Sequence, residues 1–268
     1  METCEISRNE IPRLLEISDI VDEGKDQKSI FFRHSMDCKP GQFIMVWLPD
    51  VDEKPMAISY WKKNEFAFTY KTIGKFTKAL DDFKKKDKLG VRGPYGNSFS
   101  IKENACVVGG GVGMASVSTL IDVLKNPVVI NGARSKDYLI YLKRFKNSNT
   151  IATTDDGSFG KKGFVTEALD EALSKNKIKV VYTCGVEVMM KKVLEVCNKH
   201  KVELEASLER YMSCGFGICG KCMVNDKIVC IDGPIFNSKQ LMNMPEFGNF
   251  ARLKSGRKVS LQEYHTVH

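Results

Sequence analysis

Residues 105–124 decide the fold, and they read Ala105-Cys-Val-Val-Gly109-Gly-Gly-Val-Gly113-Met-Ala-Ser-Val-Ser-Thr-Leu-Ile-Asp-Val-Leu124. The first four residues are typical of a short buried strand, the glycines form a turn, and helical spacing continues from Met114. Two further apolar runs, 128–130 and 179–183, are separated by helix-compatible sequence such as 166–173. Strands that alternate with helices predict parallel βαβ units.

The glycine turn is also a candidate nucleotide site. A turn between a strand and a helix presents backbone N–H groups at the positive end of the helix, where a pyrophosphate can bind. The spacing is not the full G-x-G-x-x-G, and a glycine-rich turn can be purely structural. We predict nucleotide binding at four glycines: Gly109, Gly110, Gly111 and Gly113.

The residues before this stretch have a different pattern. From Ile11 to Phe99, short runs rich in β-branched and aromatic residues, such as 42–47 and 65–70, alternate with Gly and Pro. Strands at this spacing predict a small antiparallel barrel or sandwich. The predicted fold class is therefore multi-domain, β followed by α/β.

Four of the nine cysteines form the sequence Cys214-x4-Cys219-x2-Cys222-x7-Cys230. An odd number of cysteines in a chain without an export signal argues against a disulfide framework. The spacing is that of plant-type [2Fe–2S] proteins, and the intervening glycines allow the backbone to approach its cargo closely. Structural zinc also takes four thiolates, but usually as two short-spaced pairs, which this stretch lacks. We predict an iron–sulfur cluster, with a turn at Asn225-Asp226 closing the short spacer.

Composition excludes several classes of protein. No apolar run approaches the roughly 18 residues that would span a bilayer, and the N-terminus has no signal-peptide pattern. We expect a cytoplasmic protein that binds no membrane. The net charge of +8, from 41 basic and 33 acidic residues, is spread along the chain without a basic stripe, so no nucleic-acid partner is expected.

Two segments within the predicted barrel could hold a flavin diphosphate. They are 54–60 and 70–77, and they combine a cation, hydroxyl groups and a glycine turn. They could equally be two ordinary barrel strands and a turn. The candidate residues are Lys54, Pro55, Met56, Ala57, Thr69, Tyr70, Lys71, Gly74, Phe76 and Thr77.

Together these motifs resemble a known family, the electron-transfer subunits of type B (NAD-linked) dihydroorotate dehydrogenase, a branch of the ferredoxin–NADP reductase superfamily. The likeness extends to about Phe236, in the family's order. Besides the cysteine stretch 209–222 and Cys230-x-Asp-Gly-Pro234, it rests on Gly93-Pro-Tyr-Gly96, Thr154-Asp-Asp-Gly-Ser-Phe-Gly160 and Cys184-Gly185 followed by Glu187 and Met189.

The resemblance implies cofactors and a partner. It implies FAD bound by a barrel domain (1–99), NAD bound by an α/β domain (100–204) and a [2Fe–2S] segment (205–242), and the residues after them (243–268) are expected to be an irregular tail. Cys184 and Gly185 would lie near the nicotinamide, and Asp155 could face the adenosine. The family's FMN-containing catalytic subunit would be the partner, in a heterotetramer of two copies of each. No acid or base of this chain is then expected to act on dihydroorotate.

Two departures from the family pattern concern the flavin. Lys54 replaces an arginine, so a bidentate phosphate contact becomes a point charge. Ala57 replaces a serine expected near flavin N5, and strand alternation places Ser59 on the same face as Ala57 but about 6.6 Å away. We expect altered flavin reactivity.

Two alternatives remain open. A small subunit of a sulfide dehydrogenase or of an NADH-dependent ferredoxin:NADP+ oxidoreductase would share most of these motifs with a different partner. A zinc-binding interaction module would use the same four cysteines without redox chemistry. Arg134 and Ser135 follow the second βα strand, and the choice between NAD and NADP stays undecided.

Overall fold

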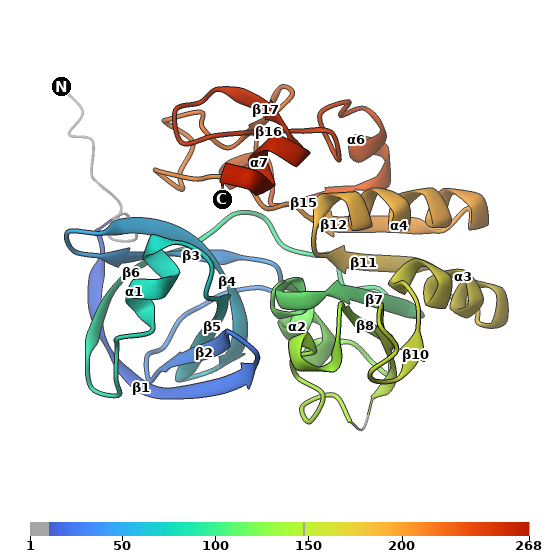
Figure 1. Ribbon diagram of the computed structural model, residues 1–268, viewed down its shortest axis with the longest axis horizontal. Coiled ribbons are helices and arrows are strands. Elements are labelled where there is room, and N and C mark those ends of the chain that lie inside the picture. The colour runs from blue at the N-terminus through green and yellow to red at the C-terminus, as the bar shows by residue number, and fades with distance from the viewer. Residues whose placement is uncertain (1–10, 147, 268) are drawn as a thin grey trace.

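The computed structural model describes residues 11–146 and 148–267. A β-barrel and an α/β unit lie side by side, and the C-terminal part of the chain lies across both (Figure 1). Among these residues no helix combines the length and the apolar character needed to cross a membrane.

The first unit is a closed antiparallel barrel with the strand order β1-β2-β5-β4-β3-β6. Alternation of apolar and polar residues turns one face of each strand inward, where side chains such as Ile30, Phe68 and Leu89 form a fully buried core. Helix α1 (Lys75–Leu80) packs Phe76 and Leu80 into the same core. The strands are β1 (Arg13–Gly24), β2 (Gln27–Phe32), β3 (Phe43–Leu48), β4 (Asp52–Lys62), β5 (Glu65–Lys71) and β6 (Lys88–Tyr95).

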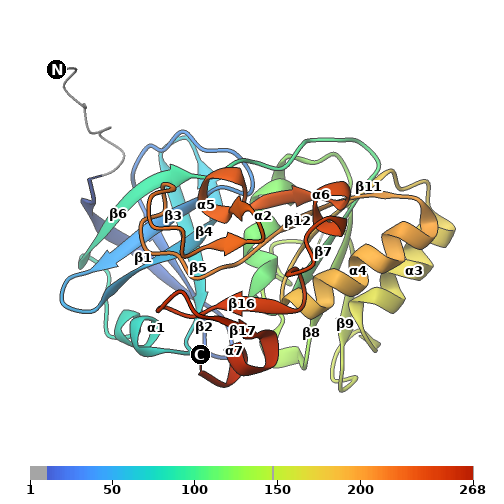
Figure 2. The ribbon, with the colours of Figure 1, turned by 90° about the horizontal axis from the view of Figure 1, so that it is seen from above.

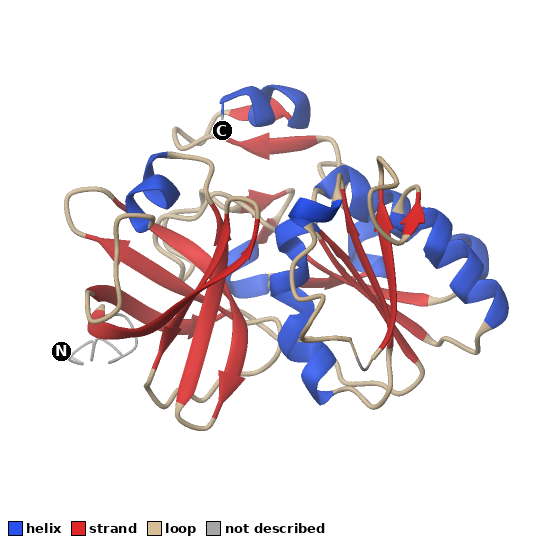
Figure 3. Cartoon of the chain, turned by 60° about the horizontal axis from the view of Figure 1, so that its bottom comes forward, coloured by secondary structure: helices blue, strands red, loops and turns tan. Residues whose placement is uncertain are grey.

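The second unit is a sheet with the order β10-β9-β8-β7-β11-β12-β15, parallel except for its last strand. Helix α2 packs on one face, and α3 and α4 pack on the other. Figure 3 shows this sandwich beside the barrel. The strands are β7 (Ala105–Gly110), β8 (Val128–Ala133), β9 (Asn149–Thr154), β10 (Lys161–Lys162), β11 (Val180–Cys184), β12 (Glu203–Ser207) and β15 (Ile235–Asn237), and the helices are α2 (Met114–Val123), α3 (Val165–Lys175) and α4 (Glu187–His200).

The predicted fold class is confirmed, an antiparallel barrel followed by a parallel α/β sheet. Strands β7 and β11 are parallel neighbours, but the order in which strands are added to the sheet reverses between them, because β8 and β9 lie on one side of β7 while β11 and β12 lie on the other. Such a switch point leaves a crevice at the carboxyl ends of the strands, where ligands of open α/β sheets bind.

The expectation of an irregular tail over 243–268 is wrong. Its described residues form a hairpin of β16 (Phe250–Arg252) and β17 (Lys258–Ser260), followed by helix α7 (Leu261–Val267). The hairpin buries Ala251 and Val259, and Met244 and Phe247 join the core of the α/β unit. These apolar residues are too widely spaced to show a periodicity, so the sequence did not predict the hairpin or the helix.

The cysteine segment is also tied to the α/β unit. The boundary expected between 204 and 205 falls inside β12, and β15 pairs with β12 in an antiparallel register from Glu205–Asn237 to Ser207–Ile235. The remaining elements of the segment are the hairpin β13 (Met223–Val224) and β14 (Lys227–Ile228), α5 (Val229–Asp232) and α6 (Ser238–Met242). We keep the other domain boundaries given above as a proposal, and we count β12 and β15 with the α/β sheet.

Candidate functional site

Three of the four clustered cysteines lie in the loop before β13 and the fourth, Cys230, lies in α5, and they contact each other as two pairs. The side chain of Cys214 interacts with that of Cys219, and Cys222 with that of Cys230. Among the residues that the structure describes, no three His, Cys, Asp or Glu side chains gather around a single metal position. Two pairs of thiols suit a cluster in which each of two irons takes two thiolates.

Backbone geometry supports the same ligand. The N–H of Gly217 donates to Cys230 Sγ at 3.2 Å, and the N–H of Cys219 donates to Cys214 Sγ at 3.5 Å. Gly217 has φ +89°, and a Cβ there would lie 2.8 Å from Ile231. The positive φ angle favours glycine at this position.

The thiol pKa values fit a set of thiolate ligands. Burial raises the pKa of Cys214, but hydrogen bonds from the backbone N–H groups of Cys219 and Phe216 outweigh it and bring the pKa to about 7. The Cys230 thiol lowers the pKa of Cys222 to about 7 by hydrogen bonding, and the pKa of Cys230 is raised in return. Hydrogen bonds that favour the anion also favour metal binding, because the thiolate is the ligand. The residues present thus fit a [2Fe–2S] cluster.

The glycine loop lies at the switch point of the sheet. Gly109 of β7 pairs with Cys184 of β11, and β7 continues to Gly110, so the turn that follows it, 111–113, lies directly beside Gly185. A Cβ on Gly113 would lie 2.6 Å from the Cys184 carbonyl oxygen, and one on Gly110 would lie 2.5 Å from Met189 Sδ. Glycine is needed here because backbone and side chains fill the space that a side chain would occupy.

The other predicted nucleotide residues reach the same edge of the sheet. Arg134 follows β8 and Asp155 follows β9, and the Asp155 N–H donates to the Ala133 carbonyl at 3.1 Å. Burial raises the pKa of Asp155, while the charge of Arg134 lowers it. A carboxylate and a guanidinium therefore lie near each other where these strands end, and the role of Asp155 at the adenosine stays a prediction.

Lys54 of the predicted flavin segment lies between the barrel and the cysteine segment. Its Nζ is 2.9 Å from Asp52 Oδ2 and lies over the Tyr211 ring, 4.4 Å from the centroid. The next residues, Pro55, Met56 and Ala57, continue along β4 and pair with Met45, Ile44 and Phe43 of β3. Half-buried positions along this strand leave it accessible to a ligand.

As expected, Ser59 lies on the same face of β4 as Ala57, because the residues that alternate with them, Met56 and Ile58, pack in the barrel core. The register of β4 with β5 shifts only between Ile58 and Tyr60. The Ser59 hydroxyl is 2.8 Å from Thr69 Oγ1 inside the protein.

The remaining predicted flavin residues make contacts within the protein. Thr69 Oγ1 also contacts Ser29 Oγ at 2.7 Å and the Tyr141 hydroxyl, while Tyr70 donates to Asp81 at 3.0 Å. Lys71 Nζ lies 4.7 Å from the centroid of the Tyr138 ring, and Phe76 is a core residue. Thr77 Oγ1 accepts from the N–H groups of Ile73 and Gly74 at the start of α1. Their role in flavin binding stays a prediction.

Comparison with known proteins identifies the family. The model for the iron–sulfur cluster binding domain of dihydroorotate dehydrogenase B matches residues 209–242. A protein of Methanocaldococcus jannaschii, named probable dihydroorotate dehydrogenase B (NAD(+)), electron transfer subunit, is 43% identical over 93% of this chain and 99% of its own length. The chain belongs to the family of dihydroorotate dehydrogenase B electron transfer subunits.

Further comparisons agree with this family. A protein of Pyrococcus horikoshii with the same name is 42% identical over 89% of this chain and 94% of its own length. Among solved structures, one of an NADH-dependent reduced ferredoxin–NADP oxidoreductase has a TM-score of 0.77 and 29% identity over 94% of this chain and 98% of that chain. Phthalate dioxygenase reductase shares the fold, with a TM-score of 0.62 at 17% identity over 75% of this chain and 70% of that chain.

Several sequence predictions are thereby confirmed. They are the resemblance to dihydroorotate dehydrogenase B electron transfer subunits, the assignment as an oxidoreductase subunit, and the cofactor set of FAD, a [2Fe–2S] cluster and NAD.

Sequence reasoning missed an ion pair that joins the crevice to the cysteine segment. Arg210 donates to Glu187, and both side chains are buried, with 7% and 6% of their surface exposed. Glu187 follows the Cys184-Gly185 turn at the start of α4, and the Cys184 thiol lies 3.9 Å from Glu209 Oε1. Glu187 and Arg210 each lie in a family motif, but only their spatial proximity reveals the pairing.

Sequence reasoning also missed a contact between the barrel and the α/β unit. The Ser59 carbonyl accepts from Ser118 Oγ at 2.5 Å and from Arg144 Nη1 at 2.8 Å. Arg144 also lies over the rings of Tyr60 and Tyr141. This contact holds the barrel in one orientation relative to α2 and the nucleotide loop.

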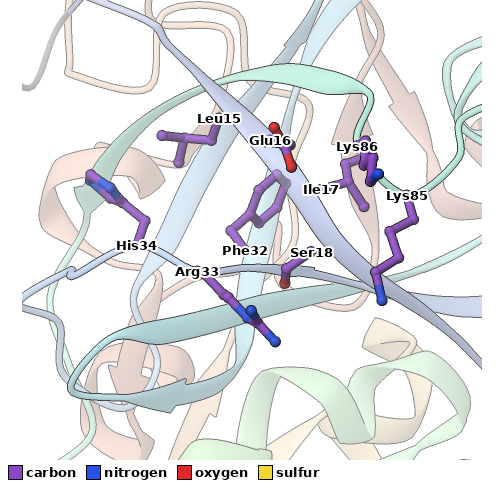
Figure 4. A pocket seen from close by; sticks show the side chains of 9 residues that line it. All are labelled: Leu15, Glu16, Ile17, Ser18, Phe32, Arg33, His34, Lys85 and Lys86. Carbon is purple, nitrogen blue, oxygen red and sulfur yellow. The ribbon is translucent and has the colours of Figure 1, made fainter.

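A hollow of about 380 Å³ on the barrel wall lies apart from these sites. It is lined by β1, β2 and the turn before β6, and Figure 4 shows Arg33 and Lys85 extending on the same side as Ser18. None of the residues predicted to bind FAD, NAD or the cluster lines it.

Proposed function

We propose that this chain passes electrons from the FMN of a separate dihydroorotate-oxidising subunit through a [2Fe–2S] cluster to FAD, and from FAD to NAD+. The observation that carries the proposal is the position of the cysteine loop beside the predicted flavin segment 54–60. The Tyr211 ring lies against Lys54 of β4, and a Cβ on Gly215 would lie 2.8 Å from Met45 of β3, which pairs with Pro55. These contacts support a cluster that lies close to the flavin.

The order of the carriers follows from their chemistry. Iron–sulfur clusters move single electrons, nicotinamide accepts a hydride, and a flavin can do both, so FAD stands between them. The residues of this chain then bind and orient the carriers. Four thiolates would hold the cluster, Lys54 would offer a cation to the flavin diphosphate, and N–H groups of the glycine turn would be available to the pyrophosphate of NAD.

We further propose that the partner subunit docks over the exposed edge of the cysteine loop, in a heterotetramer of two copies of each subunit. Cys219 is exposed, and its neighbour Ile218 and nearby Ile231 expose 79% and 54% of their surface. Apolar side chains around a redox centre suit a protein interface, because their burial is favourable and excludes water from the transfer path.

The test is anaerobic co-purification with the FMN subunit, followed by iron, sulfide and flavin analysis and addition of dihydroorotate. We expect two irons, two sulfides and one FAD for each copy of this chain, with the visible spectrum bleached by dihydroorotate only when the partner is present. Cys222→Ser should lose the cluster. Cys106 is a buried thiol of β7 outside the cysteine segment, and the control variant Cys106→Ser should keep the cluster. Full cofactors without a response to dihydroorotate would refute the proposal.

The docking face has its own test. Ile218→Glu should lower the affinity of the two subunits by about tenfold or more, because the new carboxylate would be desolvated and unpaired in an apolar contact. Ile101→Glu changes an isoleucine of similar exposure, 62%, between the two units and should leave the complex intact. Equal effects of both variants would contradict docking at the cysteine loop.

One observation supports a second candidate function. The solved structure at a TM-score of 0.77 is of an NADH-dependent reduced ferredoxin–NADP oxidoreductase. If this chain worked in such a complex, reduced ferredoxin rather than dihydroorotate would reduce its flavin.

A further inference from the structure

Five residues of the C-terminal segment, 246–250, contact both the cysteine loop and the start of α4. Figure 2, a view from above, shows the hairpin β16–β17, which begins at Phe250, lying over the junction of the barrel and the α/β unit. The family model ends at residue 242, before this stretch.

On the cysteine side, Glu246 and Asn225 exchange two hydrogen bonds. The Asn225 N–H donates to Glu246 Oε2 at 3.0 Å, and the Glu246 N–H donates to Asn225 Oδ1 at 3.1 Å. Asn225 is the turn residue between β13 and β14, with φ +52°. It lies within the spacer that joins Cys222 to Cys230, so the pair fixes the middle of that spacer.

Glu246 is held in place by two cations as well. Lys258 Nζ lies 3.0 Å and Arg252 Nη2 lies 3.7 Å from its Oε1, and only 12% of the carboxylate side chain is exposed. Burial raises the pKa of Glu246, but the hydrogen bond from the Asn225 N–H and the charges of Lys258 and Arg252 lower it by more. The pKa is therefore below its ordinary value, and the carboxylate stays ionised. Hydrogen bonds to an ionised acceptor are stronger than neutral ones.

On the nucleotide side, the same five residues contact the buried ion pair. The Gly248 N–H donates to Glu187 Oε2 at 2.9 Å, and Arg210 Nη2 donates to the Phe250 carbonyl at 3.4 Å. Glu187 is two residues after Gly185 of the crevice. One short stretch therefore connects the spacer of the cysteine loop to the loop expected at the nicotinamide.

We infer that residues 246–250 are a strut that sets the position of the cluster loop relative to the nicotinamide loop, with Glu246 as its positioning residue. Glu246 acts through Asn225 and has no direct contact with a cysteine among its hydrogen bonds and ion pairs in the described chain. This inference rests on the proposed cluster. It adds a residue outside the cysteine motif that determines how firmly the cluster is held.

The experiment uses the purified complex and measures two properties of the cluster. One is the rate at which an iron chelator bleaches its visible absorption, and the other is its electron paramagnetic resonance spectrum after reduction. Glu246→Ala should speed the loss about tenfold, equivalent to about 1.4 kcal/mol, and broaden the spectrum because the spacer samples more conformations. Glu246→Gln keeps an acceptor for the Asn225 N–H and should restore most of the difference.

Glu171→Ala is the matched control. Glu171 is also held by two cations, Lys161 and Lys175, on the far helix α3, so its loss should leave both properties unchanged. Asn225→Gly keeps the positive φ and removes the acceptor for the Glu246 N–H, and it tests the same contact if Glu246→Ala does not fold. It should also lose the cluster faster.

The outcomes separate this inference from the proposed function. Wild-type loss rates and spectra in both Glu246→Ala and Asn225→Gly would overturn the strut while leaving the cluster in place. A wild-type complex without iron would overturn the proposed function and the strut together.

Discussion

Removal of one partner from the buried Glu187–Arg210 pair should strongly destabilise the α/β unit. Arg210→Met leaves the Glu187 carboxylate buried, with the Gly248 N–H as its remaining hydrogen-bond donor among the described contacts. The substitution also removes the donor to two carbonyl groups, that of Glu209 at 2.8 Å and that of Phe250 at 3.4 Å. An uncompensated buried charge costs about 3–5 kcal/mol, a large part of the total stability of a domain.

The assay is urea denaturation of the purified chain, with the free energy of unfolding obtained by linear extrapolation. Glu187→Leu should cost about as much as Arg210→Met. The double variant should fall short of the sum by about 2–3 kcal/mol, because it leaves neither charge buried and alone. Hydrogen exchange of the α4 amides would locate the effect.

A matched exposed pair provides the control. Lys175 and Glu171 lie one turn apart on α3, with side-chain exposures of 69% and 45%. Lys175→Met should change stability by about 0.3–0.5 kcal/mol, the usual contribution of such a pair. The reasoning would be refuted if Arg210→Met cost no more than Lys175→Met, or if the two core substitutions were additive.

Three further predictions concern other parts of the molecule. Gly113→Ala should weaken NAD binding about tenfold in titrations, because its Cβ would lie 2.6 Å from the Cys184 carbonyl oxygen, and unchanged NAD binding would contradict this. Thr69→Val should lower stability by about 1–3 kcal/mol in denaturation, since it removes the buried hydroxyl that contacts those of Ser29, Ser59 and Tyr141; an unchanged midpoint would contradict this. Burial raises the pKa of Asp81, but hydrogen bonds from Lys28, Thr72 and Tyr70 lower it by more, so the pKa is below its ordinary value. The ionised Asp81 therefore stabilises the fold above about pH 4, and this contribution is lost as the pH falls below that. Asp81→Asn should therefore flatten the pH dependence of stability in acid, and an unaltered acid profile would count against this.

Several features of the site could be read from the sequence because their signals are local. The thiol spacing of Cys214, Cys219 and Cys222 specifies a ligand type within nine residues, and the turn 109–113 is bounded by a strand and a helix with clear periodicity. Parallel strands then bring Cys184 and Asp155 to the same edge as the glycines. The sequence and this one topological rule were enough to place the crevice.

Other features depended on contacts between distant residues. Strand alternation placed Ser59 on the face of Ala57, but it could not show that the Ser59 carbonyl accepts from Ser118 and Arg144, which lie 59 and 85 residues away in the α/β unit. The tail showed no periodicity because Met244, Phe247 and Ala251 bury their side chains against elements formed much earlier in the chain.

The sequence alone thus determined the order of the barrel, the α/β sheet and the cysteine loop, together with the chemistry of the ligands, because periodicity and spacing act over a few residues. Only the tertiary structure decided how these parts are joined. The pairs Glu187–Arg210 and Asn225–Glu246 connect residues 23 and 21 positions apart, and Lys54 meets Tyr211 across most of the chain. Such pairings depend on which surfaces meet when the core closes, and no local pattern encodes that.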